Sequence, residues 1–275
     1  MTQSRKLWIA AVVLTMAAAG WQRRTGPSYP YRTMIVAGGT ARPVSLARSN
    51  PTSSGARVAV PASAASAGGA LHWRRYPTND SFAVLPLRPE GGELVAALPV
   101  QPPAGKVEYY LELQSAGEPI RVPANAGEVV ILRYHGPVPA IVLIPHIVVM
   151  FLAMLIGVRA GLAAVFNAPE HRTLALITLV GLTLGGLVLG PITQHYAFGA
   201  FWTGVPWGWD LTDNKTLLMW LGWAVAGVAM LRQWRATRWL VVCAMVLMVA
   251  VYVVPHSVRG SQLDYSSHPS PTPPR

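Results

Sequence analysis

The feature that most constrains this chain is a series of long apolar segments, each bounded by clustered charges. Between residues 138 and 254 the charged residues gather at 159–172, 210–215 and 232–238, and the stretches between these clusters are apolar. A helix needs about 20 such residues to cross the hydrocarbon core of a bilayer. Only 12% of the whole chain is charged, whereas a soluble domain has about 25%. The pattern predicts a polytopic α-helical membrane protein.

We expect five membrane-spanning helices, at residues 7–21, 138–158, 173–192, 216–231 and 239–254. The first of these segments has two interpretations. Arg5 and Lys6 precede its apolar run and three alanines follow at 17–19, as in a secretory signal peptide. The other interpretation is an uncleaved anchor, so residues 1–22 are predicted to be an N-terminal membrane anchor or signal segment.

The distribution of arginine predicts the orientation in a bacterial inner membrane. Loops with an excess of Lys and Arg stay in the cytoplasm. Arg232, Arg235 and Arg238 lie between the last two apolar segments with no acid among them, so we expect this loop on the cytoplasmic side. Five spans then put the N-terminus in the cytoplasm. The region between the first and second spans and the C-terminus both lie in the periplasm.

The net charge of +11 comes mostly from arginine. The basic residues of the chain are spread over predicted helix ends and an external segment and do not gather on one face. This distribution argues against nucleic-acid binding. Anionic lipid or an acidic partner surface fits this distribution better. The single cysteine, Cys243, excludes a disulfide within the chain.

The chain outside the apolar segments divides by composition. Residues 23–67 are rich in Gly, Pro and Ser with scattered Arg, and we expect them to form an extended linker. Residues 68–136 contain short strand-like runs separated by Gly and Pro clusters, a pattern typical of an antiparallel β-sandwich. The last four spans are predicted to form a transmembrane domain at 137–256, followed by an extended Pro-rich periplasmic tail at 257–275.

The candidate site is the aromatic loop between the third and fourth spans, together with histidines at the outer ends of spans. The candidate cofactor-binding residues are His146, His195, His256, Trp202, Trp207, Trp209 and Asp210. Imidazole is the commonest side-chain ligand for metals, including those of heme and chlorophyll-type pigments. The alternatives are histidines bonded to helix-end backbone groups, tryptophans anchored at the membrane interface, and an acid at the start of the fourth helix.

Two stretches resemble known families locally. The run LPVQPPAGKVEYYLEL at 98–113 resembles the turn and core-tyrosine strand of fibronectin-type or immunoglobulin-like domains. The sequence WGWD at 207–210, with His195 and His256 as flanking histidines, resembles the WWD-type loop of tryptophan-rich heme-handling proteins of cytochrome c biogenesis. The chain lacks the longer tryptophan repeat of that family. This second resemblance implies heme handling by the loop and its two histidines.

More of the chain is similar to a group of uncharacterised bacterial inner-membrane proteins, which have an immunoglobulin-like external domain and a C-terminal four-helix membrane unit. The shared sequences are GPITQHYAFGAFWTG at 190–204, DLTDNKT at 210–216 and a PHS…G…LDY ending at 255–265. The resemblance implies this architecture and carries no activity.

These features lead to two functions of different classes. The sequence has no nucleophile triad, phosphate-binding loop, dinucleotide fingerprint or zinc-helix motif, so we expect no enzyme. The predicted spans contain no acid or lysine, which argues against an ion or proton pathway. We expect a non-catalytic accessory or assembly subunit of a larger membrane complex, such as a respiratory or photosynthetic electron-transfer assembly, without a cofactor of its own. The alternative is a heme- or metal-handling membrane protein of the cytochrome c biogenesis type.

Overall fold

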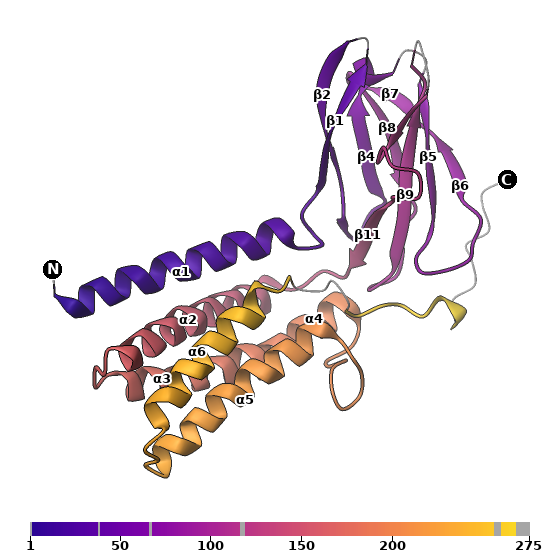
Figure 1. The fold of residues 1–275 in the computed structure, drawn as a ribbon. Coiled ribbons are helices and arrows are strands. Elements are labelled where there is room, and N and C mark those ends of the chain that lie inside the picture. Colours follow the sequence, from indigo (N-terminus) through magenta and orange to yellow (C-terminus); the bar gives the residue numbers. More distant parts are fainter. Residues whose placement is uncertain (1, 38, 66–67, 116–118, 256–259, 268–275) are drawn as a thin grey trace. The chain divides into compact units, whose positions relative to one another are not determined.

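The computed structural model describes residues 2–37, 39–65, 68–115, 119–255 and 260–267. Two compact units are present, one of helices and one of strands (Figure 1). The helical unit comprises Met1–Gly26 and Val138–Ser261, and the sheet unit comprises Pro27–Pro137 and Gln262–Arg275.

The sheet unit is built mainly of antiparallel strands. Its strands are β1 (Tyr31–Ala37), β2 (Thr40–Leu46), β3 (Ser49–Pro51), β4 (Ala56–Pro61), β5 (Gly69–Arg75), β6 (Ala83–Pro86), β7 (Arg88–Glu90), β8 (Glu93–Leu98), β9 (Lys106–Leu113), β10 (Ile120–Val122) and β11 (Val130–His135). One sheet has the order β3-β11-β9-β5-β6, with β10 also paired to β9, and a second has the order β4-β8-β7. Strands β1 and β2 form a hairpin, and only β3 pairs in parallel, with β11.

One hydrophobic core joins both sheets and the hairpin, because alternate side chains of each strand point to the same side. Val58 of β4, Leu111 of β9 and Ile35 of β1 all belong to it. In β9, the strand expected to carry a core tyrosine, Tyr109 is fully buried and donates a hydrogen bond from Oη to the Ala47 carbonyl at 2.7 Å. The strands predicted within 68–136 are confirmed, and the arrangement is sandwich-like.

Residues 31–61 form strands β1 to β4 rather than the extended linker that we expected at 23–67. Strand β4 pairs with β8 along its whole length and buries Val58 and Val60. In β1, by contrast, Ile35 is the only buried side chain. The core residues of this segment, such as Val58 and Val60, alternate with exposed Arg, Pro and Ser residues, which explains why its composition resembles that of a linker.

The helical unit contains seven helical segments in the described chain. They are α1 (Gln3–Thr25), α2 (Ala140–Val165), α3 (His171–Leu182), a π-helical segment (Thr183–Leu189), α4 (Gly190–Phe198), α5 (Leu211–Leu231) and α6 (Thr237–Val253). Among the described residues, α2, the continuous helix His171–Phe198 and α5 are long and apolar enough to cross a membrane. Helix α6 is apolar but has 17 residues. Spans in α1 and α6 therefore stay predictions.

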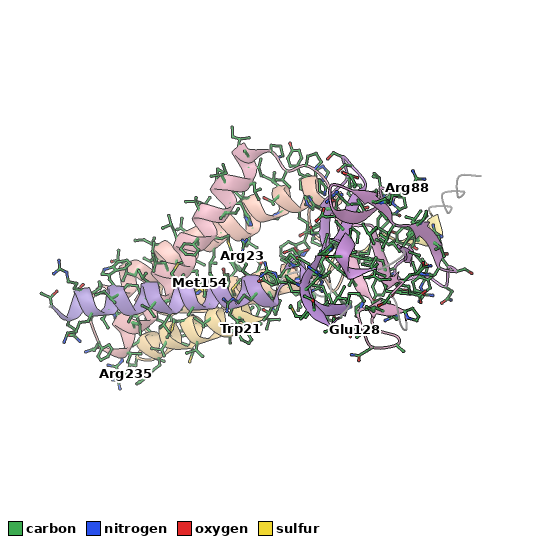
Figure 2. All side chains as sticks on the ribbon, turned by 90° about the horizontal axis from the view of Figure 1, so that it is seen from above. Trp21, Arg23, Arg88, Glu128, Met154 and Arg235 are labelled. Atoms are coloured by element: carbon green, nitrogen blue, oxygen red, sulfur yellow. The ribbon has the colours of Figure 1, made fainter. Side chains whose placement is uncertain are left out.

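Helices α1, α2, α5 and α6 share a second core, in which small residues of one helix meet large residues of another. Ala11 of α1, Ala153 of α2, Trp223 of α5 and Met248 of α6 all lie in it. Figure 2 shows Arg235, between α5 and α6, at the end of the unit where α1 begins. The segment α1 is therefore part of the helical unit.

The π-helical segment interrupts the third predicted span next to Pro191. Proline has no amide hydrogen to donate, so the regular ladder of hydrogen bonds cannot continue through it. Just before it, the Gly190 amide donates to the Gly185 carbonyl, five residues back. A Cβ atom added to Gly185 would lie 2.8 Å from Met150 Sδ of α2, so glycine permits the close approach of the two helices here.

Candidate functional site

Helix α5 begins earlier than the predicted fourth span because Asp210 caps it. Its Oδ1 accepts hydrogen bonds from the amides of Thr212 at 2.7 Å and Asp213 at 3.4 Å. Its Oδ2 accepts from the amide of Ser261 at 2.6 Å and from the hydroxyl of the same residue at 2.9 Å. Burial alone would raise the pKa of Asp210, but the hydrogen bonds, first those from Ser261, hold this pKa below its ordinary value.

Asp213 lies in the first turn of α5 and its side chain is almost completely enclosed, with 4% of the residue exposed. Its Oδ2 accepts from the Thr203 amide at 2.6 Å, the Gln194 Nε2 at 3.1 Å and the Thr203 hydroxyl at 3.3 Å. Neither Asp213 nor Asp210 forms an ion pair with a residue that the structure describes. Asp213 and Lys215 are both buried in α5, which corrects the expectation that no acid or lysine lies inside a span.

His146 follows Pro145 near the start of α2, and its ring reaches the π-helical segment. Its Nδ1 lies 2.9 Å from the Gly185 carbonyl, which also accepts from the Gly190 amide. A carbonyl can only accept, so Nδ1 carries the proton and Nε2 of the neutral ring is left as an acceptor. Metal-binding histidines commonly have their second nitrogen held in this way.

These side chains line a single cleft of about 350 Å³ within the helical unit. Its polar lining includes His146, Thr193, Gln194, Asp210, Asp213 and Ser261. Its apolar lining includes Ile147, Met150, Phe151, Ala197 and Phe198. The cleft therefore combines two carboxylates and an imidazole with an apolar wall, inside a bundle whose longest helices are able to cross a membrane.

The predicted aromatic residues lie outside this cleft. Trp207 is 79% exposed and Trp209 is 86% exposed, although the loop that carries them is ordered by the Trp207 amide, which donates to the Gly204 carbonyl at 2.9 Å. The Trp202 indole donates from Nε1 to the Val205 carbonyl at 3.1 Å. These tryptophans shape and cover a loop surface and do not line the cleft.

The structure does not bring the predicted histidines together. His195 is exposed at the end of α4 and stacks on Phe201, with ring centroids 4.1 Å apart. His256 lies outside the described residues. Of the predicted set, His146 and Asp210 share the cleft. Within the described part of the chain, no group of three or more His, Cys, Asp or Glu side chains is placed to hold a metal ion.

Of the cleft residues, only His146 and Asp210 were predicted, and three of the polar residues that sequence reasoning missed are Thr193, Gln194 and Asp213. The sequence contains a pattern that could have indicated each of these residues. Thr193 and Gln194 are adjacent polar residues near the end of an apolar helix. Asp213 follows Asp210 by three residues, a spacing that puts two side chains on one face of a helix.

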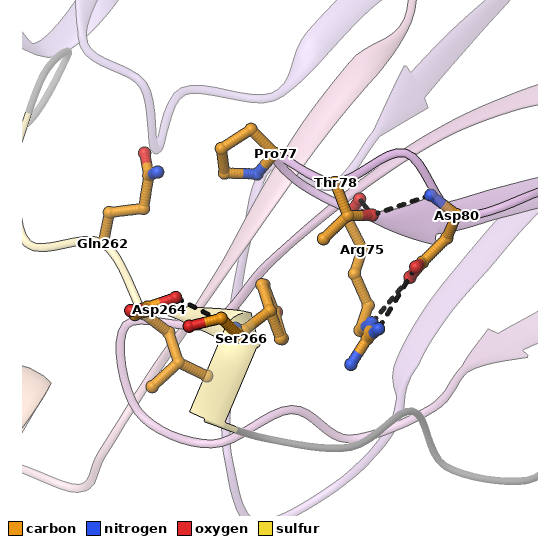
Figure 3. Close-up of a pocket in the computed structure, with 9 residues that line it drawn as sticks. Arg75, Pro77, Thr78, Asp80, Gln262, Asp264 and Ser266 are labelled. Carbon is orange, nitrogen blue, oxygen red and sulfur yellow. Dashed lines mark hydrogen bonds and ion pairs between the residues drawn. The ribbon is translucent and has the colours of Figure 1, made fainter.

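A second cavity, of about 470 Å³, lies on the sheet unit (Figure 3). There, Arg75 donates two hydrogen bonds to the Asp80 carboxylate, from Nε at 2.6 Å and from Nη2 at 3.1 Å. The hydrogen bond from Arg75 lowers the pKa of Asp80. Both charges are thus already paired with each other, so this cavity is a weaker candidate for a charged ligand than the cleft.

The C-terminal segment forms one side of this second cavity. The ring of Tyr265 lies under the Arg75 guanidinium, with 5.0 Å between the guanidinium carbon and the ring centroid. Its Oη donates to the Lys106 carbonyl at 2.9 Å, and burial raises its pKa to about 12. Residues 262–267 thus pack on the sheet unit instead of extending away as predicted for 257–275, while 256–259 and 268–275 lie outside the described residues.

No known protein-family model matches the chain, and a comparison with curated proteins finds no match. The resemblances to uncharacterised inner-membrane proteins and to heme-handling proteins therefore stay predictions, and the function is argued from the residues themselves.

Proposed function

We propose that this protein spans a bacterial inner membrane with five helices, α1 and α6 included. At 1.5 Å per residue, α1 would be about 35 Å long and α6 about 25 Å, close to the roughly 30 Å of the hydrocarbon core. Ile9, Val13 and Met16 of α1 are exposed, large and apolar, as expected of side chains that face lipid. The sheet unit would then be an immunoglobulin-like sandwich in the periplasm.

The basic residues support a cytoplasmic N-terminus. Arg159 Nη2 donates to the Ser4 hydroxyl at 3.2 Å, which joins the start of α1 to the last turns of α2. Arg235 lies at this same end of the helical unit (Figure 2). Arginine-rich loops are retained in the cytoplasm, and their guanidinium groups would contact anionic lipid there.

Within that membrane the protein would act as a non-catalytic accessory or assembly subunit of a larger complex, of the respiratory or photosynthetic electron-transfer type. The observation that carries this proposal is the exposure of Trp207 and Trp209 on an ordered loop. The loop is tied to α5 by the Val205 amide, which donates to Asn214 Oδ1 at 2.7 Å. Tryptophan dominates the energetic centres of protein interfaces, and an ordered loop loses little entropy on binding.

Purification from native membranes in mild detergent tests the accessory role. A tagged full-length chain should carry other membrane-protein subunits in fixed stoichiometry, identified by mass spectrometry. The double variant Trp207→Ala with Trp209→Ala should lose them, while Trp234→Ala, an exposed tryptophan between α5 and α6, should keep them. A monodisperse chain without partners would contradict the proposal.

A heme- or metal-handling role is the second candidate, and the geometry of His146 favours it. With Nδ1 held by Gly185, Nε2 of this ring is oriented as a potential ligand. Purified protein should then develop a Soret band on addition of heme, and His146→Ala should alter that band more than His195→Ala. The absence of a Soret band after heme loading would count against this candidate.

A further inference from the structure

The cleft of the helical unit is lined by Asp213, a residue only 4% exposed, whose carboxylate oxygen Oδ1 accepts no hydrogen bond from a described residue. All hydrogen bonds to the Asp213 carboxylate end on Oδ2, and this carboxylate accepts no other hydrogen bond in the described part of the chain. Asp210 differs, because both of its oxygens accept hydrogen bonds. A carboxylate oxygen is a hydrogen-bond acceptor, so Oδ1 is available to an occupant of the cleft. Asp213 is therefore the open carboxylate of the cleft.

Two further acceptors line the same cleft. Thr193 Oγ1 is buried and has no hydrogen-bond partner among the described residues. His146 Nε2 is the acceptor nitrogen of a ring whose Nδ1 is held by Gly185. Three acceptors on three different helical turns thus border one cavity. The Thr193 hydroxyl can also donate, but the carboxylate oxygen and the imidazole nitrogen only accept, so an occupant that complements them brings hydrogen-bond donors.

The charge of the cleft points to the same kind of occupant. Asp210 and Asp213 come within 3.1 Å and 3.3 Å of one shared group, the Thr203 hydroxyl, yet neither acid has an ion pair in the described chain. Bringing carboxylates into a bundle of apolar helices is expensive unless a positive charge accompanies them. A cation would offset that cost directly.

The remaining lining decides between a bare ion and an organic one. Met150, Phe151 and Phe198 form an apolar part of the lining, and such a surface offers nothing to the water shell of an inorganic ion. Aromatic rings attract cations over their faces. The volume of about 350 Å³ also lies within the range of roughly 300–1,000 Å³ typical of small-molecule sites.

We propose that this cleft binds a small organic ammonium ion, with its N–H groups on Asp213 Oδ1 and its apolar body against Met150 and Phe151. A lipid acyl chain would cover the apolar wall but would leave every open acceptor unpaired. The site stands independently of the accessory role, because none of its residues belongs to the exposed tryptophan surface.

Isothermal titration calorimetry on the full-length protein in a non-ionic detergent tests the proposal. The probes are benzylammonium and benzyl alcohol, which share an apolar body and differ in charge and donors. Benzylammonium should bind at least about 10-fold more tightly than the alcohol, as expected for a charge-assisted hydrogen bond. Equal binding of the two probes, or no binding of benzylammonium, would overturn the assignment.

The variant Asp213→Asn keeps the shape of the side chain and removes its charge. It should weaken benzylammonium binding by about 10- to 100-fold and leave benzyl alcohol unchanged. Glu90→Gln, which removes an equal charge from a side chain 69% exposed in the sheet unit, should bind like the unaltered protein. Unchanged benzylammonium binding by Asp213→Asn would refute the proposal. If that variant fails to fold, the comparison of benzylammonium with benzyl alcohol on the unaltered protein still tests whether the cleft binds an ammonium ion.

Discussion

The contact between α2 and α6 can be tested by adding a single carbon atom at Gly161. A Cβ atom at this position would lie 2.4 Å from both Cβ and Cγ of Met245 in α6. Carbon atoms in favourable contact lie about 3.5–4.0 Å apart. Because one of the clashing atoms is the Met245 Cβ, which is fixed to the helix backbone, rotation of the side chain cannot relieve the clash. The two helices must instead move apart by about 1 Å.

The expected cost follows from two opposing effects. Overpacking of this kind costs about 1–3 kcal/mol, while alanine is favoured over glycine in a helix by about 1 kcal/mol. Gly161→Ala should therefore be roughly 0–2 kcal/mol less stable than the unaltered protein. Gly20→Ala is the matched control, because an added Cβ there meets no atom within 4 Å. The control keeps the propensity gain without the clash.

Unfolding of both variants in the same mixed-micelle titration, followed by far-ultraviolet circular dichroism, provides the measurement. The free energy of unfolding of Gly161→Ala should lie about 1–3 kcal/mol below that of Gly20→Ala. Equal unfolding midpoints for the two variants would refute the close packing of α6 on α2, and with it the inclusion of α6 in the core of the helical unit.

Three further substitutions probe other contacts. Tyr109→Phe should destabilise the sheet unit by about 1 kcal/mol, since it removes the hydrogen bond to the half-buried Ala47 carbonyl; faster hydrogen exchange of β9 amides would report this. Asp80 has a lowered pKa in the folded state, so its ion pair stabilises the fold above the ordinary pKa of about 3.9, and this contribution disappears as the pH falls through the folded value. Asp80→Asn should thus be about 1 kcal/mol less stable near neutral pH and should lack that part of the acid dependence, as measured by thermal unfolding across pH. Glu170→Gln removes the negative charge from the side chain that accepts from Arg159 Nη2 at 2.8 Å and should cost about 2 kcal/mol in the micelle titration, because the Arg159 side chain is only 1% exposed.

The regular elements were the predictable part of this fold. Alternation of apolar residues located β5, short runs between Gly and Pro clusters located β8 and β9, and long apolar runs located α2 and α5. The hairpin of β1 and β2 escaped detection since β1 buries only Ile35. In β4 the alternation of Ala56, Val58 and Val60 was present but was obscured by the surrounding Gly, Pro and Ser.

The candidate site was less predictable, because it depends on contacts between distant segments. Asp213 and Lys215 looked like residues flanking a span, and counting charges places such residues outside the membrane. In the structure Asp210 caps α5 ahead of them, so both fall inside the helix. The contact of His146 with Gly185 joins two different helices, and no local pattern in either helix encodes it.

The wider turn at Thr183–Leu189 fixes the direction of every side chain that follows it in the same helix. A π turn spans one residue more than an α turn, and one residue corresponds to about 100° of rotation about the helix axis. Deleting a single residue there would restore a regular helix and swing the Gln194 amide away from Asp213, although every polar group of the cleft would remain in the chain. A related protein one residue shorter at this point would keep the DLTDNKT motif and lack the site. The length of this one turn, and not the motif, therefore distinguishes proteins that have the cleft from proteins that lack it.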